Sequence, residues 1–347
     1  MLNNPTPTTL TIAAPKAVIV GLEGEILNAQ EEKLFSDHNP LGFILFARNV
    51  KHPDQVKRLV KQLRHLSGRQ DAPILIDQEG GRVARLRPPY FRKTFPAQKI
   101  AQLAEKHLEH AKESAYLSGK LMGLELASLG INVDCAPVAD LLIDGAHSII
   151  GDRSYGNTVS LIVALAGEVA RGLADAGVVP IMKHIPGHGR ALVDSHEELP
   201  EVIESYDILA RHDFEVFKQL KFIPWAMTAH VVYRCLDVSH PATLSPRVIR
   251  YIRENLEYDG VIISDDLSMK ALTGSFTNKA HQAVQAGCDL LLHCNGNMTE
   301  MSEVLEAAPL LGMEAARRLE NGFQFIKPAS VCDVLELENR LAELVGG

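Results

Sequence analysis

Eight short apolar runs alternate with longer stretches of helical periodicity along this chain, and this alternation constrains its fold more than any other feature. The apolar runs are residues 17–22, 42–46, 73–76, 133–137, 178–182, 225–228, 261–264 and 290–293. The helical stretches include residues 55–66, 101–129, 160–176, 208–219 and 246–255. A strand followed by a helix, repeated at this spacing, predicts parallel strands joined by crossover helices. About eight such units in roughly 300 residues favour a (β/α)8 barrel over an open sheet.

The chain shows no linker and no low-complexity segment. Of its 347 residues, 46% are hydrophobic, enough for one large domain or two modest ones. We predict a single-domain (β/α)8 TIM barrel of the α/β class over residues 1–347, with its core at about residues 15–330. Residues 331–345 are predicted to form a last helix packed outside the barrel. No GxGxxG follows the first apolar run, which argues against a dinucleotide-binding sheet.

Charge and cysteine content narrow the functional class. The formal charge of -8 is spread along the sequence without a basic block, so no nucleic-acid partner is expected. The five cysteines are an odd number and form no CxxC pair, which favours reduced thiols in a cytosolic protein. Residues 1–14 do not resemble a signal peptide, and no apolar window reaches the length of a membrane span. We expect a cytoplasmic enzyme without a membrane partner.

Ionisable side chains follow the fifth apolar run. The run ends on Lys183 and His184, and the chain then enters a loop rich in glycine and proline. Barrel enzymes place their catalytic residues at such strand ends. Asp194 and His196 lie two positions apart, so an extended backbone would put both on one side, where the carboxylate could hold the imidazole as a proton carrier. The alternative is a solvated loop in which Asp194 caps a helix.

The third and fourth apolar runs also lead to charged residues. Asp77 ends the third run, paired glycines follow it, and Arg85 comes soon after. A carboxylate and a guanidinium are suited to binding sugar hydroxyls, although a structural Asp–Arg pair explains them equally well. The fourth run leads to Asp140 and then to Arg153 in a loop bounded by glycines. On its own, Asp140 followed by an arginine loop is weak evidence for a functional site.

Two adjacent acids end the seventh run. Asp265 and Asp266 follow an aliphatic strand, where buried carboxylates are costly unless they are paired or hydrogen-bonded. One of them could be a nucleophile or a base. Periodicity does not decide which, because adjacent strand residues face opposite ways. His230, after the sixth run, either joins the same rim or is a hydrogen-bonded structural residue.

Four of these motifs, in this order, resemble the signature of glycoside hydrolase family 3, in its β-N-acetylhexosaminidase branch (the NagZ type). The motifs are DQEGGRV at 77–83, GDRSYG at 151–156, KHIPGHG at 183–189 with DSH at 194–196, and SDDLSM at 264–269. The resemblance runs from about residue 42 to residue 295. Ile185 stands where the family commonly has Phe, an apolar exchange. The chain also lacks the second, α/β-sandwich domain of the family's β-glucosidases, which favours the single-domain hexosaminidases.

The resemblance implies a role for each matched position. Asp265 is the implied nucleophile, and Asp194 with His196 is the implied general acid/base dyad. The implied sugar-binding residues are Asp77, Arg85, Arg153, Lys183 and His184. The roles of His230 and Asp266 stay open.

The same resemblance implies an activity. The chain is expected to be a retaining exo-β-N-acetylglucosaminidase (a β-N-acetylhexosaminidase) that forms a covalent glycosyl-aspartate. The implied substrates are N-acetylglucosaminyl-anhydromuramoyl peptides, small molecules of cell-wall recycling. We expect no cofactor and no metal, we favour a monomer, and we expect the loop carrying the dyad to close over substrate.

Several alternatives remain. Within the family, the chain could be a phosphorylase, with phosphate replacing water, or a β-glucosidase. A metal-dependent barrel hydrolase could use as ligands His184, His188, His196, His230 and Asp265. Such barrels generally carry His-x-His at the first strand end, and residues 17–22 contain no histidine. A non-catalytic sugar-binding protein is disfavoured, because the catalytic positions are intact.

Overall fold

The computed structural model describes residues 14–327 and 332–346, and eight parallel strands within them close into a barrel. In barrel order the strands are β1 (Lys16–Val20), β10 (Leu290–His293), β9 (Val261–Asp266), β7 (Trp225–Thr228), β5 (Val179–Ile185), β4 (Val133–Asp134), β3 (Ile74–Ile76) and β2 (Pro40–Leu45). Each neighbouring pair is parallel, as crossover helices require. The predicted (β/α)8 barrel is therefore confirmed, with each strand at its predicted apolar run.

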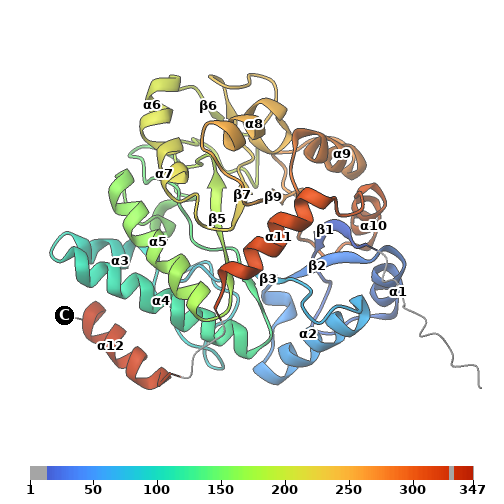
Figure 1. Cartoon of the computed structure of the whole chain (residues 1–347), viewed down its shortest axis with the longest axis horizontal. Helices are drawn as coiled ribbons and strands as arrows, with labels where there is room; N and C mark the ends of the chain where they lie inside the picture. Colours follow the sequence, from blue (N-terminus) through green and yellow to red (C-terminus); the bar gives the residue numbers. More distant parts are fainter. Residues whose placement is uncertain (1–13, 328–331, 347) are drawn as a thin grey trace, which may run out of the picture.

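Helices surround the barrel (Figure 1). They are α1 (Ala29–His38), α2 (Pro53–Ser67), α3 (Ala97–Ala104), α4 (Leu108–Ser128), α5 (Val159–Asp175), α6 (Tyr206–Arg211), α7 (Asp213–Gln219), α8 (Pro246–Glu254), α9 (Phe276–Ala286), α10 (Met298–Ala307), α11 (Met313–Phe325) and α12 (Val334–Gly346). Single 3-10 turns occur at η1 (Ala47–Asn49), η2 (Gly151–Arg153) and η3 (Ala242–Leu244). None of the described helices is long and apolar enough to cross a lipid bilayer.

The helix α2 illustrates how local sequence sets these elements. Pro53 occupies its first turn, where the missing N–H costs nothing, and the His52 side chain accepts a hydrogen bond from a backbone N–H of that turn. Its buried side chains recur at helical spacing: Gln55, Val56, Leu59, Val60 and Leu63. Gly68 ends the helix at a φ of 67°, a conformation that favours glycine.

Two predicted helices are each divided in the structure. Residues 101–129 contain the end of α3 and all of α4, and residues 208–219 contain the end of α6 and all of α7, which separate at His212. Neither division carries Pro or Gly, the residues that usually mark a break, so periodicity alone could not locate it. The second division turns Asp213 toward Arg190, with which it forms a 2.7 Å ion pair. A small sheet of β6 (Glu201–Val202) and β8 (Val232–Tyr233) was not predicted.

Strands β5 and β9 are longer than their apolar runs predicted. Lys183 and His184 lie inside β5, and Asp265 and Asp266 are the last residues of β9. These polar residues keep the strand conformation because neighbouring strands continue to pair with them. The pairing register shifts at both places, and the adjacent side chains Lys183 and His184, like Asp265 and Asp266, line one cavity instead of alternating between two faces.

The hydrophobic core has two layers. Alternate strand residues fill the barrel interior, among them Ile19, Leu75, Val133, Ile181, Trp225, Ile263 and Leu292. Their neighbours point outward and pack against the helices. Helix α11 contacts β5 and β9 near the end of the barrel at which the strands begin, and Figure 1 shows it lying across the barrel. The opposite end, where the strands finish, remains open for a site.

The predicted C-terminal helix is present as α12, and it packs outside the barrel. Leu341 and Leu344 bury their side chains against Leu117 and Leu121 of α4. The predicted start of this helix, Val331, and residues 1–13 lie outside the described residues.

Candidate active site

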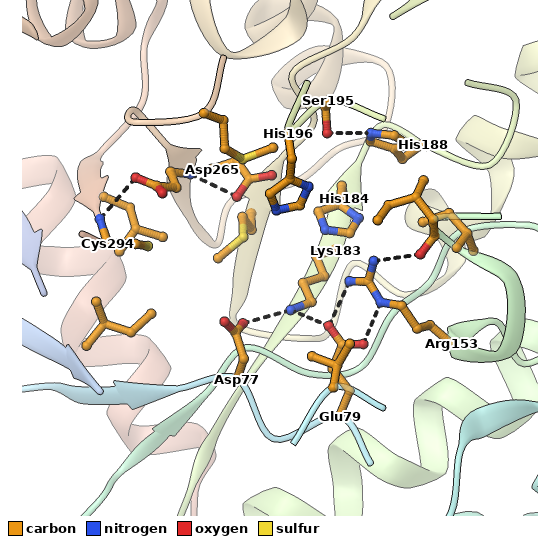
Figure 2. Close-up of a pocket in the computed structure, with 18 of the residues that line it drawn as sticks. Asp77, Glu79, Arg153, Lys183, His184, His188, Ser195, His196, Asp265 and Cys294 are labelled. Atoms are coloured by element: carbon orange, nitrogen blue, oxygen red, sulfur yellow. Dashed lines mark hydrogen bonds and ion pairs between the residues drawn. The ribbon is translucent and has the colours of Figure 1, made fainter. Parts of the chain in front are cut away.

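A cavity lies at the ends of the barrel strands (Figure 2). Charged and polar side chains from β5, β9 and the loops that follow β3, β4 and β5 line it. They include Asp77, Glu79, Arg82, Arg85, Arg153, Lys183, His184, His188, Ser195, His196, Asp265 and Asp266. Apolar side chains such as Ile44, Phe46, Met227 and Leu292 complete the wall. The cavity is therefore at the catalytic end that the barrel prediction specified.

A cluster of five ion-paired residues forms one side of the cavity. The Lys183 ammonium lies 3.0 Å from the Asp77 carboxylate and 2.7 Å from that of Glu79. Arg85 approaches Asp77 at 2.9 Å, and Arg153 donates two hydrogen bonds to Glu79, at 2.7 and 2.8 Å. Figure 2 shows Lys183 between the two carboxylates. The paired charges hold one another in fixed positions, as bidentate geometry favours.

The residues of this cluster keep their charges at neutral pH. Burial alone would raise the pKa of Glu79, but the nearby Arg153 and Lys183 cations outweigh it and hold that pKa at about 2. The same balance between burial and the Lys183 and Arg85 cations lowers the pKa of Asp77. Burial would lower the pKa of Lys183, yet the two carboxylates raise it. The cluster can therefore bind hydroxyl groups with fixed charges, but it is not suited to exchanging protons near pH 7.

His184 is oriented by a buried carboxylate. Its Nδ1 lies 2.7 Å from Oδ2 of Asp140, which is fully buried and also accepts the backbone N–H of His188 at 2.6 Å. Burial would raise the pKa of Asp140, but His184 and these hydrogen bonds lower it. An ionised carboxylate only accepts hydrogen bonds, so Nδ1 of His184 carries a proton.

The two acids at the end of β9 have different surroundings. The Asp266 carboxylate accepts hydrogen bonds from the Ser268 backbone at 2.9 Å, the Ser268 hydroxyl at 2.6 Å and the Cys294 backbone at 3.0 Å. The Asp265 carboxylate accepts one, from the Asp266 N–H at 2.8 Å, and lies beside His196 (Figure 2). Burial would raise the pKa of Asp265, but positive charge on His230 and His184, with the Asp266 N–H, lowers it. Asp265 is thus the acid available to a ligand.

His230 lies behind these acids and does not line the cavity. Its Nε2 is 3.0 Å from the carbonyl oxygen of Asp266, and its Nδ1 is 2.7 Å from the Thr243 hydroxyl. A carbonyl oxygen can only accept, so Nε2 donates and the fully buried ring supports the backbone of β9. Across residues 14–327 and 332–346, no three His, Cys, Asp or Glu side chains are arranged to hold a metal ion.

The two residues of the predicted dyad pair with each other on the loop after β5. The Asp194 carboxylate lies 2.8 Å from Nδ1 of His196 and accepts its backbone N–H at the same distance. Burial would raise the pKa of Asp194, but its hydrogen bonds with His196 lower it. His196 lines the cavity with a side chain that is 61% exposed, whereas Asp194 reaches the cavity only through it. No helix begins at Asp194, so the helix-cap alternative is wrong.

The structure brings the predicted site residues together. The residues that line one cavity are Asp77, Arg85, Arg153, Lys183, His184, His196 and Asp265, with Asp194 bound to His196. Sequence reasoning did not select Glu79 or Asp140, although both orient residues that it did select. Glu79 stands two positions after Asp77, a spacing that puts side chains on one side of an extended chain. Asp140 closely follows the fourth strand, the same signal that marked Asp77.

Comparison with known proteins establishes the family. The sequence model of the glycosyl hydrolase family 3 N-terminal domain matches residues 16–322. The chain belongs to glycosyl hydrolase family 3. It is 37% identical over 283 residues to the β-hexosaminidase of Alkalilimnicola ehrlichii, covering 80% of each chain. It is 39% identical over 292 residues to that of Haemophilus ducreyi, covering 80% of this chain and 81% of the relative.

Solved structures of the same family share the fold. Native NagZ from Neisseria gonorrhoeae matches with a TM-score of 0.84 and 28% identity, over 96% of this chain and 98% of that one. A family 3 β-N-acetylglucosaminidase from Paenibacillus sp. FPU-7 matches with a TM-score of 0.81 and 32% identity, over 95% of this chain and 67% of that one. The predictions of a family 3 glycoside hydrolase of the β-hexosaminidase type and of a TIM barrel are confirmed.

Proposed function

We propose that this family 3 hydrolase is a retaining exo-β-N-acetylglucosaminidase that acts on N-acetylglucosaminyl-anhydromuramoyl peptides. One observation carries the mechanism. The Asp265 carboxylate and the Asp194–His196 pair meet at one cavity, which the charged cluster lines on another side. A nucleophile, a proton carrier and fixed hydroxyl-binding charges are the parts that a retaining glycosidase needs.

In the first half-reaction, Asp265 attacks the anomeric carbon of the terminal sugar. Its lowered pKa keeps the carboxylate ionised at neutral pH, ready to form the new C–O bond. The anomeric carbon loses its bond to the leaving oxygen, which takes the proton of the His196 imidazolium. The negative Asp194 at 2.8 Å stabilises the imidazolium and holds its orientation.

In the second half-reaction, water replaces the aspartyl group. Neutral His196 accepts a proton from the water as its oxygen bonds to the anomeric carbon, and the Asp265 carboxylate leaves. Two displacements at one carbon retain its configuration. Lys183, Arg153 and Asp77 hold the hydroxyls of the ring throughout, because their charges do not change.

The relatives support N-acetylglucosamine as the sugar. They are named β-hexosaminidases, and NagZ from Neisseria gonorrhoeae has been solved in complex with N-trifluoroacetyl-D-glucosamine. All five cysteines are free, as thiols are in the reducing cytoplasm, where we place the reaction. Cell-wall fragments with a terminal N-acetylglucosamine are the proposed substrates in that compartment.

The direct test incubates the pure protein with N-acetylglucosaminyl-anhydromuramoyl peptide and measures free N-acetylglucosamine. The p-nitrophenyl N-acetyl-β-glucosaminide should be cleaved and the matching glucoside should be a poor substrate, because the pocket must accept the 2-acetamido group. An Asp265→Ala variant is the control for contaminating activity. An intact muropeptide alongside a cleaved glucoside would instead indicate a β-glucosidase. Formation of the sugar 1-phosphate in phosphate buffer would indicate a phosphorylase.

A further inference from the structure

The segment of residues 190–198, which we call the acid–base loop, carries His196 into the cavity, but most of it is in contact with solvent. Between residues 192 and 199, Ser195 is the only buried residue; its exposed fraction is 3%. The remaining seven are half-buried or exposed, including both members of the dyad. A loop with so little buried surface needs specific contacts to keep one position over the cavity.

Ser195 makes such contacts on both its side chain and its backbone. Its hydroxyl lies 3.0 Å from Nε2 of His188, and its carbonyl oxygen accepts the backbone N–H of Ala271 at 3.2 Å. Figure 2 shows Ser195 and His188 joined beside His196. Among the described residues, the other side chain of the acid–base loop that forms an ion pair outside it is Arg190, at its first position, with Asp213 at 2.7 Å and Glu204 at 3.6 Å. From residue 192 to residue 198, Ser195 is the one side chain with such a contact.

His188 is itself fixed to the barrel. The residue is 3% exposed, and its ring packs edge-on against that of His184, with ring centroids 5.5 Å apart. Its backbone N–H donates to the buried Asp140 carboxylate at 2.6 Å. Ser195 therefore bonds to a side chain that the barrel holds in place.

The dyad does not provide this attachment. Both hydrogen bonds between Asp194 and His196 are internal to the loop, so they set the direction of the imidazole relative to the loop only. The position of the imidazole relative to Asp265 on β9 depends on where the loop lies. The Ser195 contacts attach the loop to the ends of both strands, because Ala271 follows β9 and His188 follows β5.

We propose that Ser195 and His188 are positioning residues that fix the acid–base loop over the cavity and thereby place the His196 proton at the leaving oxygen. This inference rests on the proposed function of His196. Without the Ser195–His188 contact the loop samples other positions, and His196 is in reach of the substrate for less of the time. Proton donation then falls, whereas attack by Asp265, which belongs to the barrel, is unaffected.

The test compares kcat/KM for two aryl N-acetyl-β-glucosaminides, 2,4-dinitrophenyl and p-methoxyphenyl. The dinitrophenolate leaves without a proton, and kcat/KM reports only the first half-reaction, where the acid acts. We expect Ser195→Ala to lower kcat/KM for the p-methoxyphenyl substrate about tenfold and for the dinitrophenyl substrate less than about twofold. Glu198→Ala, an exposed change in the same loop, is the matched control and should alter neither value.

A second variant and a second measurement keep the test decisive. Ser195→Cys nearly preserves the shape of the side chain and weakens its hydrogen bond, so it should show a smaller shift in the same direction. Amide hydrogen exchange in residues 190–198 should be faster in Ser195→Ala than in Glu198→Ala. Equal losses on both substrates, or no loss on either, would overturn the proposal.

His196→Ala separates this proposal from the proposed function. If that variant loses activity selectively on the p-methoxyphenyl substrate but Ser195→Ala does not, the positioning role is wrong and the acid role of His196 stands. If His196→Ala loses activity equally on both substrates, the acid role itself fails.

Discussion

Asp266 accepts three hydrogen bonds through its carboxylate, whereas Asp265 accepts one. Two identical side chains, adjacent on one strand, thus differ in what they can do. Asp266 ties the turn after β9 to the backbone of Cys294, and Asp265 keeps an oxygen available in the cavity. Hydrogen-bond partners, more than residue type, separate a structural acid from a candidate nucleophile.

The first prediction follows from this difference. Asp265→Ala should abolish formation of the glycosyl-enzyme while leaving the free energy of unfolding nearly unchanged, and a fluorinated glycoside should label Asp265 in the wild type. Asp266→Ala should lower the free energy of unfolding by about 1–3 kcal/mol, because three partly buried donors lose their acceptor. Mass spectrometry of the trapped enzyme and urea unfolding provide the two measurements. A label on Asp266 would show that the roles are reversed.

The second prediction concerns Asp194. Asp194→Ala should lower kcat/KM for substrates with poor leaving groups about tenfold, less than the roughly 10²–10⁴-fold loss for His196→Ala. The reason is that Asp194 orients and charges the imidazole but transfers no proton to the substrate. A pair of leaving groups of different acidity measures both effects. A loss for Asp194→Ala as large as that for His196→Ala would give Asp194 a more direct role.

At the scale of elements, the site depends on ion pairs that connect separate loops. Glu79 follows β3, Arg153 lies in η2 after β4, and Lys183 is part of β5, yet the Glu79 carboxylate contacts both cations. An unpaired buried charge is strongly unfavourable, so each of these charges needs its partner from another element. The contacts proposed to bind substrate hydroxyls therefore also connect three barrel units.

The third prediction concerns how the stability contributed by the ion pairs of Glu79 depends on pH. The pKa of Glu79 is about 2 in the folded protein against 4.5 ordinarily, so its contribution to stability is complete above pH 4.5 and is lost as pH falls toward 2. Glu79→Gln should lower the free energy of unfolding at pH 7 by about 3 kcal/mol and flatten its fall between pH 4.5 and 2. Urea unfolding across that range tests this, and parallel wild-type and variant curves would contradict it.

For the whole molecule, the cavity and the C-terminal helix α12 lie in different regions. The catalytic cavity is at the end where the strands finish, whereas α12 packs outside the barrel against α4 through Leu117 and Leu121. This separation is general for barrels, because loops at one end carry function while the rest of the shell carries packing. Changes in α12 should therefore alter stability without altering catalysis.

The fourth prediction compares two leucines of α12. Leu344 is 8% exposed and packs on α4, whereas Leu335 is 64% exposed on the same helix. Leu344→Ala should lower the free energy of unfolding by about 2 kcal/mol or more, and Leu335→Ala should change it by less than about 0.5 kcal/mol. Both variants should keep wild-type kcat/KM, measured on p-nitrophenyl N-acetyl-β-glucosaminide. A loss of catalysis in Leu344→Ala at a temperature where it is folded would show coupling between α12 and the cavity.

Much of the fold could be predicted from local pattern. Each barrel strand was identifiable because a strand buried on both faces is a short apolar run, and the repeat of strand and helix restricts the topology to a barrel. The polar ends of β5 and β9 were not identifiable as strand. Each apolar run is interrupted by polar residues (Lys183 and His184 in β5, Asp265 and Asp266 in β9), which neighbouring strands keep extended. The divisions at residues 105–107 and 212 contain neither Pro nor Gly, so they left no local signal.

The sequence by itself determined the barrel, the end of it that carries chemistry, and the residue types that meet there, because periodicity and motif spacing are local properties. Beyond the Asp194–His196 pair, which the spacing indicated, tertiary structure decided which atoms pair. It assigned Asp266 to the Cys294 backbone, Glu79 to Arg153 and Lys183, and Ser195 to His188. These partners come from separate elements or lie several residues apart in a loop, so their contact depends on how the barrel closes. A linear pattern records spacing along the chain, whereas a hydrogen bond depends on distance and direction in space.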